Sequence, residues 1–210
     1  MDSLSLLFGS EEKVKIMRLF LFNPGQAFGL TDIANRAQVR TARVKKETKL
    51  LSKTGLIVPK GVLRITESKK GKKIKIRKKK EKGWALAEDF PYYSHLRDLL
   101  LRTVLFDSED VLKRLKRAGR IKLLILSGVF IQETESRVDL LIVGDGLKQG
   151  VLERVIRSIE AEIGKELRYA SFETPDFRYR WGMYDKLVRD ILDFPHKKVV
   201  DKIGVASEKR

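Results

Sequence analysis

Two stretches decide how this chain is interpreted: Thr41-Ala-Arg-Val-Lys-Lys-Glu-Thr-Lys-Leu-Leu-Ser-Lys53 and Lys69-Lys-Gly-Lys-Lys-Ile-Lys-Ile-Arg-Lys-Lys-Lys-Glu-Lys82. The first predicts a helix with Val44, Thr48 and Leu51 on one face, because residues three or four apart lie on the same side of a helix. The opposite face is small or cationic: Ala42, Lys45, Lys46 and Lys49. A helix with one apolar and one cationic side is suited to lie along a polyanion.

The second stretch predicts a β-hairpin with its tip at Gly71. Isoleucines at 74 and 76 alternate with cations, which gives a strand one apolar and one basic face. A lysine run can also be a solvated loop, but beside the predicted helices we favour phosphate contact. Lysine discriminates poorly between bases, so the hairpin should add affinity and salt sensitivity. The cations assigned to this contact are Lys69, Lys70, Lys72, Lys73, Lys75, Arg77 and Lys78.

Positive charge is concentrated in the first half of the chain. The 210 residues carry a formal net charge of +17. Residues 1–90 hold 22 Lys+Arg against 9 Asp+Glu, a surplus of 13, whereas residues 91–210 hold 23 against 19, a surplus of 4. A surplus of this size indicates an anionic partner for the first half, either nucleic acid or an acidic membrane surface.

The order of predicted elements in this half is a helix at about 11–22, two further helices, Gly55-Leu56-Ile57 and a hairpin. This order resembles the winged helix-turn-helix family over residues 8–88. The resemblance implies that the helix from Thr41 enters the major groove of double-stranded DNA, while the hairpin contacts the flanking backbone. Arg40, Thr41 and Arg43 are then the candidates for reading base edges, since arginine can present two donors to guanine, and Lys45, Lys46 and Lys49 accompany them.

Residues 89–106 are predicted to be a linker helix after Pro91. Leu96, Leu99-Leu100 and Val104 lie on one side, and Tyr92-Tyr93 and Leu101 on another. A helix that is apolar on more than one side must be covered. We expect it to pack between domains or to pair with its copy in a homodimer.

The second half predicts an α+β domain over residues 107–210. We expect a helix from Asp107 to about Ala118, strands at 121–130, 137–143 and 168–173, a helix at 150–165 and a single closing helix at 178–192. The fold class of the whole chain is therefore α+β, with domains 1–88 and 107–210 joined by the linker.

The order of elements around Leu126-Ser127-Gly128-Val129 and Ser136-Arg137-Val138-Asp139 resembles the minimal nucleotidyltransferase fold, a mixed sheet with helices. Active members hold nucleotide phosphates with Gly-Ser and hold Mg²⁺ with an Asp-x-Asp pair and a third carboxylate. Here Ser127-Gly128 inverts the first element, and Arg137 replaces the first Asp. A cation at that position repels a metal. The resemblance therefore implies a vestigial pocket of Ser127, Gly128, Arg137 and Asp139 without catalytic residues, in which Asp139 pairs with Arg137 or another nearby base.

The composition excludes other classes of site. There is no cysteine, so disulfides and thiolate chemistry are excluded, and the two histidines are far apart in sequence. We expect no metal site and no cofactor, with Mg²⁺ and a nucleotide only if the second domain is an enzyme. No stretch approaches the about 20 apolar residues that cross a bilayer, and we expect a cytoplasmic protein.

We therefore predict a transcriptional regulator that binds double-stranded DNA, as a homodimer. Its second domain, which we expect to be catalytically silent, dimerises, senses a nucleotide or other ligand, or recruits a protein. The alternatives are an active metal-dependent nucleotidyltransferase and an RNA-binding protein, since phosphate contacts do not distinguish RNA from DNA.

Overall fold

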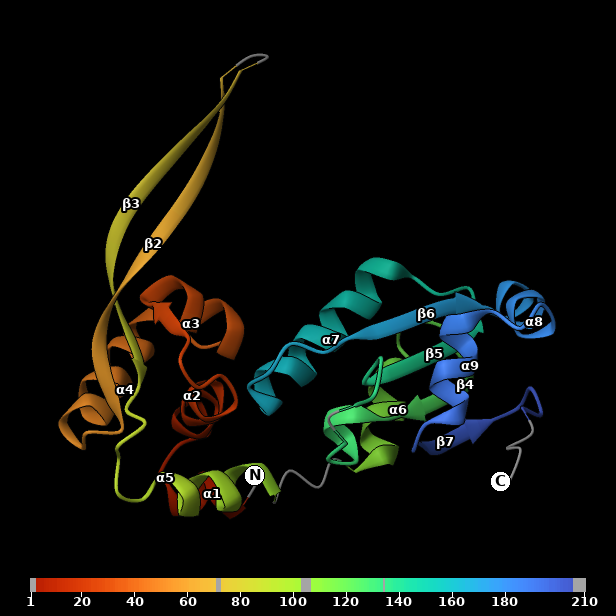
Figure 1. The fold of residues 1–210 in the computed structure, drawn as a ribbon, viewed down its shortest axis with the longest axis horizontal. Helices are drawn as coiled ribbons and strands as arrows, with labels where there is room; N and C mark the ends of the chain where they lie inside the picture. The colour runs from red at the N-terminus through yellow and green to blue at the C-terminus, as the bar shows by residue number, and fades with distance from the viewer. Residues whose placement is uncertain (1–2, 71–72, 103–106, 134, 206–210) are drawn as a thin grey trace. The chain divides into compact units, whose positions relative to one another are not determined.

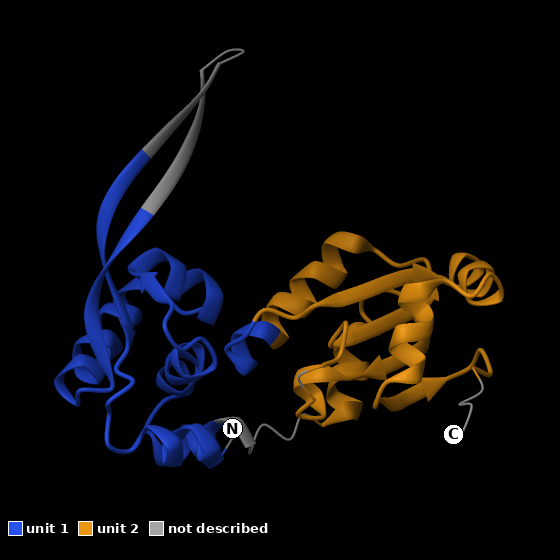
Figure 2. Ribbon diagram, in the orientation of Figure 1, with its two compact units in different colours: residues 1–104, 160–165 blue, residues 105–159, 166–210 orange. Residues whose placement is uncertain are grey.

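The computed structural model describes residues 3–70, 73–102, 107–133 and 135–205 (Figure 1). For residues 64–70, 73–77 and 101–102 it describes the backbone and not the side chains. The chain is α+β. It divides into two compact units, residues 1–104 with 160–165 and residues 105–159 with 166–210 (Figure 2). Each unit is described by itself.

The first unit opens with α1 (Ser3–Leu7) and α2 (Glu11–Phe22). The predicted helix at 11–22 is confirmed, and the Ser10 hydroxyl caps it by accepting the N–H of Lys13 at 3.1 Å. Next come β1 (Ala27–Gly29), α3 (Leu30–Ala37) and α4 (Thr41–Lys53). Gly55 follows α4 with φ +81, the left-handed conformation that ends helices and that glycine adopts without steric cost.

A long hairpin completes the sheet of the first unit. β2 (Ile57–Lys70) pairs antiparallel with β3 (Lys73–Leu86), from Ile57 opposite Leu86 to Lys70 opposite Lys73. β1 pairs with the root of β3, so the strand order is β1-β3-β2. The hairpin then extends beyond the three helices as a two-stranded ribbon (Figure 1).

One apolar cluster joins the helices to the root of this hairpin. Phe20 and Phe28 meet edge to face with ring centroids 5.7 Å apart. Fully buried residues from α2, α3 and α4 and from the start of β2 surround them: Ile16, Leu19, Ile33, Val44 and Ile57. Burial of side chains this size contributes about 1.5–3 kcal/mol each, so the hairpin root is held as firmly as the helices.

The predicted linker helix is interrupted. α5 (Tyr93–Arg97) is followed by a π-helical turn, η1 (Asp98–Arg102), and both belong to the first unit. Leu100 is buried in the core of that unit, and its carbonyl accepts the Nε–H of Arg18 at 3.1 Å. The predicted continuation over residues 103–106 lies outside the described residues.

The second unit contains a four-stranded mixed sheet of order β6-β5-β4-β7. Its elements are α6 (Ser108–Leu115), β4 (Arg120–Leu126), the 3-10 turn η2 (Gly128–Phe130), β5 (Leu140–Asp145), α7 (Gln149–Ile163), β6 (Tyr169–Glu173), α8 (Thr174–Gly182), α9 (Lys186–Asp193) and β7 (Lys197–Asp201). β5 pairs parallel with β6, and β4 pairs antiparallel with β5 and β7. The apolar faces of α8 and α9 cover this sheet through Phe177, Val188 and Ile191.

Two predictions for this unit are wrong, and one strand was missed. The strand predicted at 137–143 begins at Leu140, because residues 136–139 form a turn in which the Asp139 carbonyl accepts the N–H of Ser127. The closing helix is two helices, because Asp185 caps α9 by accepting the N–H groups of Leu187 and Val188. Strand β7 was not predicted; it pairs with β4 at the edge of the sheet.

Candidate functional site

Helix α4 is buried along one stripe and exposed along the other, as predicted. Val44, Thr48 and Leu51 are buried. The outward side is formed by Thr41, Ala42, Lys45, Lys46 and Lys49, all exposed, and Arg40 just before the helix is exposed as well. Three ammonium groups on one helix face give this side a local positive field that attracts anions.

Arg43 differs from the other predicted contacts. Its Nε lies 3.9 Å from Glu12 Oε1 on α2 and 3.9 Å from Glu47 Oε1 one turn further along α4. Glu47 is 3% exposed, and its second oxygen lies 3.9 Å from the Lys13 ammonium. Arg43 therefore joins α4 to α2. The burial of Glu47 was not predicted, although Glu47 lies three residues after Val44 and four before Leu51, on the buried stripe of α4.

The hairpin adds a second exposed set of cations. Residues 57–86 contain 12 Lys or Arg and only 2 Glu. The described lysines on the nearer half of the ribbon are all exposed: Lys60, Lys78, Lys79, Lys80 and Lys82. The backbone register alone places Lys69, Lys70, Lys73, Lys75 and Arg77 on the strands, and Lys72 lies outside the described residues.

A glycine positions the root of this ribbon. Gly83 lies opposite both Gly29 of β1 and Lys60 of β2. A Cβ at residue 83 would meet the Phe28 carbonyl oxygen at 2.7 Å and the Lys60 carbonyl oxygen at 3.0 Å. Because both contacts are backbone atoms, they cannot move aside as a flexible side chain would. Gly83 therefore allows the three strands to approach closely where the ribbon leaves the core.

In the second unit, Ser127, Gly128 and Asp139 come together in one buried turn. The Asp139 carboxylate, 1% exposed, accepts the N–H of Val129 at Oδ1 (3.0 Å) and the N–H of Arg168 at Oδ2 (2.9 Å). The Arg168 Nε also lies 3.4 Å from Oδ2. The base that pairs with Asp139 is thus Arg168 and not Arg137.

Ser127 and Gly128 also donate hydrogen bonds within this turn. The Ser127 hydroxyl donates to the Val138 carbonyl at 2.5 Å, and the Gly128 N–H donates to the Ser136 hydroxyl at 3.1 Å. Gly128 has φ +53, and a Cβ there would overlap Asp139 Oδ1. The polar groups that would bind a phosphate are therefore used within the turn.

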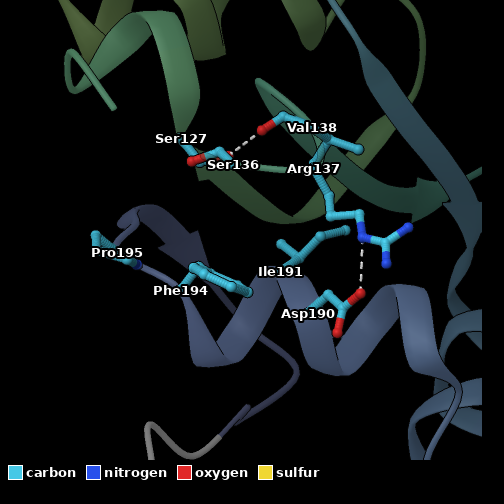
Figure 3. A pocket seen from close by; sticks show the side chains of 8 residues that line it. All are labelled: Ser127, Ser136, Arg137, Val138, Asp190, Ile191, Phe194 and Pro195. Carbon is cyan, nitrogen blue, oxygen red and sulfur yellow. Dashed lines mark hydrogen bonds and ion pairs between the residues drawn. The ribbon is translucent and has the colours of Figure 1, made fainter. Parts of the chain in front are cut away.

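Arg137 lies apart from this turn's carboxylate. Its Nε is 2.8 Å from Asp190 Oδ2 on α9, beside a hollow with an empty volume of about 160 Å³ (Figure 3). Side chains on both sides of the hollow line it: Ser127, Ser136, Arg137, Val138, Asp190, Ile191, Phe194 and Pro195. That volume includes open solvent, and the hollow encloses no space for a water-sized sphere, so it is too small for a nucleotide.

These residues do not fit a magnesium site, because both oxygens of Asp139 accept N–H groups and Arg137 is itself a cation. Among the described residues, no cluster of three or more His, Cys, Asp or Glu could hold a metal ion. Within the same part of the chain, no helix combines the length and apolar character needed to span a bilayer.

The chain matches no protein-family model, no curated protein sequence and no solved structure. The chain therefore offers two candidate sites, the cationic surface of the first unit and the closed turn of the second.

Proposed function

We propose that the first unit binds double-stranded DNA and that the protein is a transcriptional regulator. One observation carries the proposal: the outward face of α4 presents Lys45, Lys46 and Lys49, and the cation-rich hairpin follows directly in the chain. An α-helix fits the major groove of B-DNA, and lysines neutralise its phosphates. The order of helices and hairpin is also the one on which the resemblance to winged helix-turn-helix proteins rests.

The proposal gives the residues different roles. Arg40 and Thr41, exposed at the start of α4, contact base edges, because residues near the start of a recognition helix lie deepest in the groove. The lysines of α4 and the hairpin cations assigned from Lys69 to Lys78 contact phosphates. Arg43 is assigned to holding α4 on α2, because its guanidinium lies between two carboxylates.

The second unit is proposed to be a catalytically silent relative of the nucleotidyltransferases. Supporting this, the Asp139 carboxylate is buried and both its oxygens accept hydrogen bonds, so it offers no free ligand to a metal. Its role would be to form the homodimer, to sense a ligand or to bind a protein partner. A two-fold dimer would place two copies of α4 on half-sites about one helical turn apart.

Fluorescence anisotropy tests the proposal. Random-sequence duplex DNA, single-stranded DNA and duplex RNA of equal length are titrated with the full chain at several salt concentrations. We expect the duplex DNA to bind most tightly, with a steep fall in affinity as salt rises. If RNA bound more tightly than duplex DNA, RNA and not DNA would be the partner. If the affinity for duplex DNA were the same at all salt concentrations, phosphate contacts would not drive the binding.

A further inference from the structure

The β2–β3 hairpin sorts its residues by charge onto two faces. Residues directly opposite each other in an antiparallel pair share a face, and successive residues alternate between faces. Beyond the pair of Val62 with Glu81, the opposed positions on one face hold only cations and hydroxyl residues. These pairs, which we call the cationic face, are Arg64 with Lys79, Thr66 with Arg77, Ser68 with Lys75 and Lys70 with Lys73.

The intervening positions have a different composition. Each pair combines one aliphatic residue with one charged residue. These pairs, which we call the aliphatic face, are Leu63 with Lys80, Ile65 with Lys78, Glu67 with Ile76 and Lys69 with Ile74. The one acid among the sixteen positions, Glu67, belongs to the aliphatic face. The cationic face is thus an unbroken row of positive and hydroxyl residues.

Two of the four pairs in the cationic face place one cation opposite another. Cations stand opposite each other at Arg64 with Lys79 and at Lys70 with Lys73, and like charges directly opposite in a sheet are destabilising. A polyanion laid along the face would remove that repulsion. The arrangement therefore favours an extended anionic partner over a compact one.

The length of the ribbon sets how far such a contact extends. The pairing with β1 ends where Gly83 lies opposite Lys60, and the pairing of β2 with β3 continues ten residues further to Lys70 opposite Lys73. The cationic face takes up the last six of these residues, from Arg64 to Lys70, because Val62 and Glu81 lie opposite each other on the same face before it. At about 3.3 Å per residue it extends about 20 Å, a little over half of the ~34 Å of one turn of B-DNA. The strands also wind about each other (Figure 1), as the ribbon twist of paired strands requires.

We propose that the cationic face lies along the phosphate backbone of duplex DNA for about half a helical turn beyond the base pairs that α4 contacts. The inference rests on the proposed function and adds to it which face of the hairpin binds and how many base pairs the protein covers.

Two variants that lose the same charge test the inference. The first replaces Lys73 and Lys75 of the cationic face by Gln, and the matched control replaces Lys80 and Lys82, which lie on the opposite face, by Gln. The measured quantity is the slope of log affinity against log salt, on duplexes of about 8 and about 20 base pairs, because each neutralised phosphate contributes about 0.9 to that slope. The slope does not depend on how many overlapping sites a longer duplex offers.

We expect the cationic-face variant to lose about 2 slope units on the long duplex and less than about 0.5 on the short one. The aliphatic-face control should lose less than about 1 unit on either. Equal losses from both variants would overturn the choice of face, and an equal loss on both duplexes would overturn the reach. Failure of the unaltered protein to bind any duplex would instead refute the proposed function.

Discussion

The main-chain N–H of Arg168 and its guanidinium Nε both face one oxygen of Asp139, at 2.9 and 3.4 Å. The other oxygen accepts the N–H of Val129 at 3.0 Å. N–H donors therefore replace water around a buried negative charge, which is the condition under which a carboxylate is tolerated in a protein interior. Asp139 therefore joins the turn after β4 to Arg168, the residue before β6.

Replacing Asp139 by Ala should destabilise the second unit by about 3–5 kcal/mol, because buried N–H donors are left without an acceptor. Arg168→Ala is the matched control. Its side chain is 52% exposed, and an exposed ion pair contributes about 1 kcal/mol or less. Urea unfolding, followed by Trp181 fluorescence in a Trp84→Phe background, isolates the second unit. If both variants lost the same unfolding free energy, the buried N–H hydrogen bonds to Asp139 would contribute nothing to stability.

Gly128→Ala should destabilise the same unit by at least about 2 kcal/mol, because a left-handed backbone and a clash with Asp139 act together. Gly150→Ala, at a position on α7 where a Cβ meets no atom within 4 Å, should stabilise the protein by up to about 1 kcal/mol. The same tryptophan fluorescence measures both. If Gly128→Ala left the unfolding free energy unchanged, the close packing of Gly128 against Asp139 in this turn would be wrong.

Replacing Lys45, Lys46 and Lys49 together by Ala should reduce the salt slope of duplex binding by about 3 units, since each is assigned one phosphate. The control removes equal charge from exposed positions of the second unit, Lys113, Lys116 and Lys148. It should change the slope by less than about 1 unit. If both variants lost the same amount, binding would depend on net charge and not on α4.

Arg40 and Arg43 should separate recognition from stability. Arg40→Ala should change the unfolding free energy by no more than about 0.5 kcal/mol from that of the unaltered protein. It should also weaken the DNA sequence preference that is found by selection from a random duplex library. Arg43→Ala should cost about 1–3 kcal/mol, because the buried Glu47 loses a cation. Trp84 fluorescence in a Trp181→Phe background reports the first unit. If Arg43→Ala changed the sequence preference and left the unfolding free energy unchanged, Arg43 would be a base-reading residue, as the sequence predicts.

Several features of the first unit could be predicted because they depend on short-range patterns. Ser10 followed by acids predicted the start of α2, and the spacing of Val44, Thr48 and Leu51 predicted which side of α4 is buried. Glu47 followed the same spacing, yet its charge argued for exposure. Only the packing of α4 against α2 brings Lys13 and Arg43 close enough to compensate a buried carboxylate.

The sequence by itself determined where positive charge accumulates, which helix face is apolar and that position 83 at the hairpin root is glycine, because these are properties of neighbouring residues. Tertiary structure decided the partners. Residues 29 apart in the chain are joined when Arg168 meets Asp139, and residues 53 apart when Arg137 meets Asp190. Those pairings depend on how β5, β6 and α9 pack, and long-range packing leaves no local pattern from which to infer which base a carboxylate will find.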